Sequence, residues 1–61
     1  MTIEVGGKVA LQNIPHYLRI SDGDEGIVEA ISNDPVQPYH VRIDGRIWTF
    51  PKYELKEIKA E

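Results

Sequence analysis

Residues 39–50 read Tyr-His-Val-Arg-Ile-Asp-Gly-Arg-Ile-Trp-Thr-Phe, and they carry the clearest structural signal in the chain. Residues 39–43 alternate between apolar and polar side chains, as in a strand that buries one face. Asp44-Gly45 is a favoured pair for a two-residue type I′ turn. We therefore predict an antiparallel hairpin of strands 39–43 and 46–50. Cross-strand partners share a face, so one face is a core of Tyr39, Val41, Ile43, Trp48 and Phe50, and the other exposes His40, Arg42, Ile47 and Thr49.

Weaker signals on both sides of the hairpin predict three more strands. Alternation and β-branched residues favour strands at 8–12, 26–32 and 55–58. A long loop covers 13–20, where Pro15 cannot donate to a strand ladder. Turn residues follow at 21–24, Pro35 and Pro38 bracket another loop, and residues 51–54 fit a single 3₁₀ turn.

Composition agrees with a small β protein. Eight Ile and five Val stand against three Leu and three Ala, which favours strands over helices. Sixty-one residues allow a single domain, 1–61. Five short strands, a long first loop, a tight third hairpin and a late 3₁₀ turn resemble an SH3-like barrel. We expect an all-β fold, a five-stranded SH3-like barrel with a 3₁₀ turn before the last strand, whose closure hides most strand edges.

Charge and cysteine content bear on partners and compartment. The formal net charge is −3 and the pI is about 5.2, whereas proteins that hold nucleic acid by its phosphates usually show a basic stripe and a high pI. Nucleic acid is therefore not the expected partner. The chain has no Cys, which fits a reducing compartment, and it has no long apolar run and no signal-peptide pattern in its first five residues. We expect a cytoplasmic protein without membrane insertion. The alternative location is the cytoplasmic face of a membrane complex.

Side chains that could support catalysis do not form a recognisable pattern. The candidates are His16, His40, Ser21, Ser32, Tyr17 and Tyr53, and they do not form the nucleophile, base and orienting group of a covalent catalyst.

The acidic turn from Asp22 to Gly26 resembles a calcium loop. Counted from Asp22, however, the sixth and twelfth positions are Ile27 and Asn33 instead of the Gly and Glu of such a loop. We expect no catalytic residues, no cofactor and no metal.

The first long loop and the 3₁₀ turn together supply the side chains of a protein-binding patch. Tyr, Pro and Arg are typical of such surfaces. The expected partner contacts are His16, Tyr17, Arg19, Lys52 and Tyr53. In the alternative interpretation, Tyr17, Leu18 and Tyr53 cap the open ends of the barrel instead of binding a partner.

Several short matches resemble known families of small barrels. Gly6-x-Lys8-Val9 and Gly23-x-x-Gly26-x-Val28 resemble the glycine-and-valine pattern of KOW-type barrels in ribosomal and transcription proteins, which implies RNA binding. The order Gly26-Ile27-Val28, Val41-Arg42-Ile43, Trp48-Thr49-Phe50 and Glu54-Leu55 resembles photosynthetic accessory subunits. These are the S subunit of the NAD(P)H dehydrogenase-like complex and the PetP subunit of cytochrome b6f. That resemblance implies a non-catalytic protein that docks on a larger complex or on ferredoxin.

A further match concerns residues 47–51, Ile-Trp-Thr-Phe-Pro. They resemble the Val-Gln-Ile-Tyr-Pro pore strand of the tetrameric type II dihydrofolate reductase, although Trp48 and Phe50 replace the Gln and Tyr that contact its ligands. The barrel at the end of the nitrile hydratase beta chain is also similar.

We therefore expect a non-enzymatic accessory or regulatory subunit that docks on a larger protein complex. One alternative is a KOW-like nucleic-acid-binding domain that uses Arg42, Arg46, Lys52, Lys56 and Lys59. Another is a pore-type oligomeric reductase. The sequence does not determine the oligomeric state.

Overall fold

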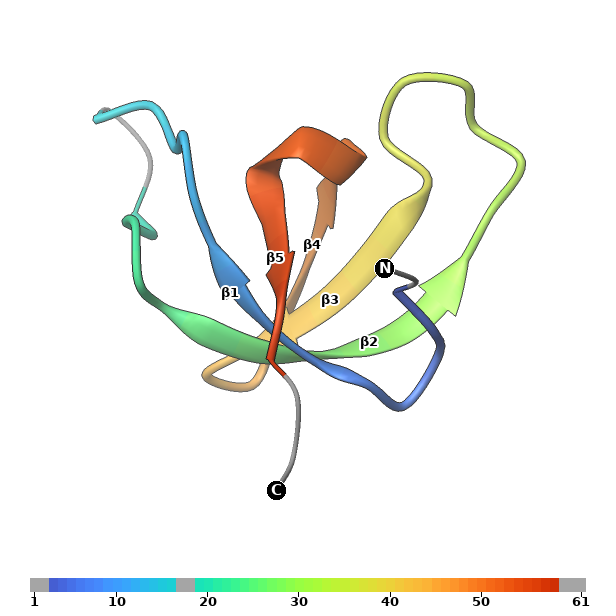
Figure 1. The fold of residues 1–61 in the computed structure, drawn as a ribbon, viewed down its shortest axis with the longest axis horizontal. Coiled ribbons are helices and arrows are strands. Elements are labelled where there is room, and N and C mark those ends of the chain that lie inside the picture. Colours follow the sequence, from blue (N-terminus) through green and yellow to red (C-terminus); the bar gives the residue numbers. More distant parts are fainter. Residues whose placement is uncertain (1–2, 17–18, 59–61) are drawn as a thin grey trace.

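The computed structural model describes residues 3–16 and 19–58, and their elements are all strands apart from one 3₁₀ turn (Figure 1). The elements in chain order are β1 (Lys8–Leu11), β2 (Glu25–Ile31), β3 (Tyr39–Ile43), β4 (Arg46–Phe50), η1 (Lys52–Glu54) and β5 (Leu55–Glu57). The predicted all-β fold, with five antiparallel strands and a 3₁₀ turn before the last strand, is confirmed. Outside the hairpin, four of the six predicted strand ends differ from these bounds by one residue, and the other two match them.

The β3–β4 hairpin has the register that the sequence predicts. Ile43 pairs with Arg46, Val41 with Trp48 and Tyr39 with Phe50. Asp44 and Gly45 have φ angles of 52° and 81°, the two left-handed conformations that a type I′ turn requires. This turn matches the right-handed twist of the strands, so the hairpin continues without a register shift.

The five strands form one sheet in the order β4-β3-β2-β1-β5. The sheet is not closed into a barrel, so that part of the prediction is wrong. Between β4 and β5 the chain passes through Pro51, which has no N–H to donate, and then through η1. The three-residue β5 pairs only with β1, which leaves β4 and β5 as the two edges of the sheet.

Strand β2 bends so that it pairs with β1 and with β3. Its first half faces β1 at Gly26 and Ile27, and its register against β3 shifts between Val28 and Ala30. Such a bulge increases the local twist and bends the strand. Figure 1 shows β2 running under both neighbouring strands.

The core is built from the strands, the N-terminal segment and the first loop. Its buried side chains are Ile3, Val9, Leu11, Ile14, Ile20, Val28, Val41, Ile43, Phe50 and Leu55. Of the five core side chains predicted for the hairpin, three are buried, while Tyr39 and Trp48 are half-buried and pack against the core. No helix in the described part of the chain has the length and apolar character needed to cross a membrane.

Candidate functional site

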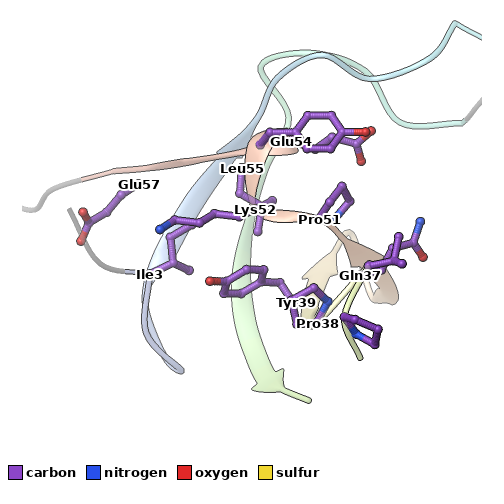
Figure 2. Close-up of a pocket in the computed structure, with 12 residues that line it drawn as sticks. Ile3, Gln37, Pro38, Tyr39, Pro51, Lys52, Glu54, Leu55 and Glu57 are labelled. Atoms are coloured by element: carbon purple, nitrogen blue, oxygen red, sulfur yellow. The ribbon is translucent and has the colours of Figure 1, made fainter. Parts of the chain in front are cut away.

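A large hollow in the described residues lies between the β2–β3 loop and the η1 turn (Figure 2). It is an open groove of about 990 Å³, which we call the Tyr–Pro groove. The residues that line it are Ile3, Pro35, Val36, Gln37, Pro38, Tyr39, Pro51, Lys52, Tyr53, Glu54, Leu55 and Glu57. They come from the N-terminal segment, the β2–β3 loop and the segment from Pro51 to Glu57, so the fold assembles the groove from distant parts of the sequence.

The groove is mainly apolar and aromatic. Eight of its twelve lining residues are Ile, Leu, Val, Pro or Tyr, and they include three of the four prolines of the chain. Val36 and Tyr53 are each 66% exposed, so large apolar surface faces solvent from both walls. In Figure 2 the half-buried ring of Tyr39 points toward Ile3. Such a surface favours contact with another apolar surface.

Hydrogen bonds hold the β2–β3 loop as one wall of the groove. The Asp34 carboxylate accepts bonds from the backbone N–H groups of Val36 at 2.8 Å and Gln37 at 3.0 Å. The bonds from Gln37 and Val36 lower the pKa of the Asp34 carboxyl below its ordinary value. On the far side of the loop, the Thr49 hydroxyl donates to the Gln37 side-chain oxygen at 2.9 Å. The loop is therefore shaped before any partner binds.

The opposite wall is fixed by the two residues that follow β1, Gln12 and Asn13. The Gln12 amide donates to the carbonyl oxygens of Tyr53 at 3.0 Å and Leu55 at 3.2 Å. The Asn13 amide also donates to the Tyr53 carbonyl, at 3.2 Å. These three bonds hold the η1 backbone in place while the Tyr53 side chain remains exposed.

Three charged side chains also line the groove. Lys52, Glu54 and Glu57 are its charged lining residues. Figure 2 shows the Lys52 side chain extending toward Ile3 and Glu57. Burial raises the pKa of the Glu54 carboxyl above its ordinary value. The groove thus combines an apolar surface with one cation and two carboxyl groups.

The structure separates the predicted contact residues. Lys52 and Tyr53 line the Tyr–Pro groove, whereas His16 and Arg19 line a different hollow of about 280 Å³ within the first loop. Tyr17 lies outside the described residues. The two halves of the predicted patch therefore do not line a common surface hollow.

Sequence reasoning missed the β2–β3 loop as a part of the site. Pro35, Val36 and Pro38 line the groove, but the prediction used them only to mark a loop. The available signal was an apolar Val between two prolines in a segment with no strand pattern. A conformationally restricted, exposed apolar loop is typical of a binding surface.

The acidic turn has a structural role in the first loop. The Asp22 carboxylate accepts a bond from the Ile14 N–H at 2.8 Å, and the Asp24 carboxylate accepts one from the Ser21 N–H at 3.0 Å. Because Ile14 and Ile20 are both buried, these bonds hold the loop against the core. Within residues 3–16 and 19–58, no three His, Cys, Asp or Glu side chains form a group suited to a metal ion.

Comparison of the chain with protein-family models, with curated proteins and with solved structures gave no match. The functional conclusion therefore depends on the fold and on the Tyr–Pro groove.

Proposed function

We propose that this chain is a non-enzymatic binding module that docks on a larger protein through the Tyr–Pro groove. The observation that carries the proposal is the concentration of Tyr, Pro and Val side chains, with Pro35, Val36 and Tyr53 exposed, on two hydrogen-bonded walls. Aromatic residues dominate binding energy at protein interfaces because they bury a large area at a small entropic cost. In this proposal the protein acts in the cytoplasm, which suits a chain without cysteine.

The hydrogen bonds of the two walls support a binding role. Ordering a loop during association costs free energy that a preformed surface does not have to supply. Asp34 orders the β2–β3 loop, and Gln12 orders the η1 backbone. The side chains of Val36 and Tyr53 are thus presented on backbone segments that are already fixed.

The partner can be identified by pull-down of the tagged protein from source lysate, with and without nuclease, followed by mass spectrometry. We expect one defined protein complex whose recovery does not depend on nucleic acid. Recovery that disappears with nuclease would instead favour the nucleic-acid-binding alternative. The charge pairing of the chain argues against that alternative, because two basic side chains already have acidic partners. Arg42 bonds to Glu29, and Lys8 lies 3.2 Å from Glu25.

A variant then tests the groove directly. Tyr53→Ala removes an exposed ring without opening a cavity in the core, so the fold should be retained. We expect binding of the captured partner to weaken by about 1 kcal/mol or more, roughly fivefold in Kd. The measurement is titration calorimetry with the purified partner.

His16→Ala is the matched control, because His16 is also exposed but lines the hollow in the first loop. The proposal requires its affinity to equal that of the unmodified chain. If His16→Ala weakens binding and Tyr53→Ala does not, the partner docks on the first loop and the groove is not the site.

A further inference from the structure

Strand β4 forms an edge of the open sheet, and its hairpin geometry shows which backbone groups face outward. In a two-residue hairpin, the residues beside the turn form a hydrogen-bonded pair, and the pair types then alternate. Ile43 and Arg46 flank the turn, so Trp48 and Phe50 also bond to β3. The N–H and C=O groups of the intervening Ile47 and Thr49 therefore point away from β3, toward the free edge.

These outward groups have no partner in the described part of the chain. Strand β4 pairs only with β3. Outside the strand ladders, no hydrogen bond described for residues 3–16 and 19–58 uses the N–H or C=O of Ile47 or Thr49. The Ile47 side chain is also 57% exposed. The free edge thus offers two donors and two acceptors next to an exposed apolar side chain.

The other edge of the sheet is protected. Strand β5 has only three residues, and two of them, Lys56 and Glu57, are charged. Its Leu55 C=O accepts the Gln12 amide, and the Leu55 N–H bonds to the Lys52 carbonyl. Charges, short length and bulges normally discourage strand addition at an edge. The β4 edge has an unbroken five-residue register and no Lys or Pro.

We propose that a second copy of this chain pairs with it, β4 to β4, in an antiparallel dimer whose two-fold axis passes beside Trp48. In this register Ile47 lies opposite Thr49 of the second copy, and Thr49 opposite Ile47. All four outward-facing residues then exchange hydrogen bonds across the axis. The two sheets become one continuous sheet.

Other registers that also place outward-facing residues of the two copies opposite each other leave backbone N–H or C=O groups unpaired. An axis beside Thr49 would place Ile47 opposite Pro51, which has no N–H. An axis beside Ile47 would place Thr49 opposite Gly45, which belongs to the turn. The edge is thus complementary to itself in one register.

The charges at the β4 edge are compatible with a second copy. Ile47 and Thr49, the side chains that meet on the outer face, are uncharged. Arg46 is the only ionisable residue of β4. In the proposed register the two Arg46 positions lie about 14 Å apart along the strands, which exceeds the screening length of about 8–10 Å at physiological salt. Like-charge repulsion across the axis is therefore weak.

The test is the oligomeric state of the full chain together with amide hydrogen exchange. We expect sedimentation equilibrium to show a monomer–dimer equilibrium. Raising the protein concentration should slow exchange at the Ile47 and Thr49 amides and leave the exposed loop amides unchanged. A chain that stays monomeric up to about millimolar concentration would overturn the proposal. A dimer in which these two amides still exchange freely would overturn it as well.

Two variants locate the interface. Ile47→Pro removes an N–H that faces outward, so the β3 ladder keeps its bonds. Ile47→Lys keeps the backbone and adds the charge that edge strands commonly use for protection. We expect each to raise the dimer Kd about tenfold or more, while Ile47→Val leaves it nearly unchanged. Trp48 fluorescence checks that each variant is folded, and unaltered dimerisation of either folded variant contradicts the β4 interface.

Discussion

Gly26 lies where β2 packs tightly against β3. A Cβ built at this position would lie 2.5 Å from the Arg42 carbonyl oxygen and 2.7 Å from side-chain carbons of Val41 and Ile43. These distances are too short for nonbonded atoms, so Gly26→Ala must push the two strands apart. We expect a loss of about 1–3 kcal/mol in the free energy of unfolding, typical of overpacked cores. Urea denaturation followed by Trp48 fluorescence measures it.

Gly23→Ala provides the comparison for that experiment. A Cβ at Gly23 would meet no atom within 4 Å, but its φ of +93° is unfavourable for a side chain. Its cost should therefore be only the backbone term of about 1 kcal/mol. A Gly26→Ala protein as stable as the unmodified chain would show that the two strands are not packed this closely.

The hairpin was predictable from single residues because its signals are local. Asp44-Gly45 determines the turn, and the turn determines which residues face each other. The half-burial of Trp48 was not predictable in this way. It depends on the position of β4 at the edge of the sheet, where Trp48 has a neighbouring strand, β3, on one side only.

Among the loops and turns, the β2–β3 loop depends on one titratable group. Asp34 accepts two backbone N–H bonds, which lower the pKa of its carboxyl below the ordinary value of 3.8. A group with a lowered pKa in the folded state contributes stability above its unfolded pKa. That contribution is lost as the pH falls through the folded value. We therefore expect the amide NMR signals of Val36 and Gln37 to titrate together, with a midpoint below 3.8.

Asp34→Asn is the control, since its amide oxygen still accepts hydrogen bonds but does not titrate in this range. The acid-dependent shift of the Val36 and Gln37 signals should disappear in that variant. A midpoint at or above the ordinary value in the unmodified chain would mean that the two bonds do not stabilise the carboxylate.

Loop conformation is the part of the site that the sequence could not predict. The Gln12 side chain reaches the Tyr53 carbonyl across 41 positions of the chain, and no local pattern contains such a bond. The sequence identified Lys52 and Tyr53 as exposed turn residues. It could not show that they line a groove with the Pro-rich β2–β3 loop, while His16 and Arg19 line a different hollow.

At the level of the whole molecule, closure of the sheet was the main error of the sequence-based prediction. Strand number, order of elements and the 3₁₀ turn follow from local patterns. Closure depends on whether the first and last strands of the sheet meet, which is set by the bend of β2 and the path through Pro51. The same open edge is the basis of the proposed dimer.

The proposed dimer and the Tyr–Pro groove lead to one joint prediction. A dimer carries two grooves, so on a surface with densely immobilised partner both can bind at once. Because the second binding event is then intramolecular, dissociation should slow by about tenfold or more compared with single-site binding. We expect this slowing for the unmodified chain and its loss in Ile47→Pro, measured by surface plasmon resonance at high partner density.

At low partner density the two proteins should dissociate at the same rate, because Ile47 does not line the groove. Tyr53→Ala should instead weaken binding at both densities, since it changes each individual site. If Ile47→Pro dissociates as slowly as the unmodified chain on the dense surface, the chain does not bind through two grooves held together by β4. If it also binds more weakly at low density, β4 itself contacts the partner and the two surfaces are not independent.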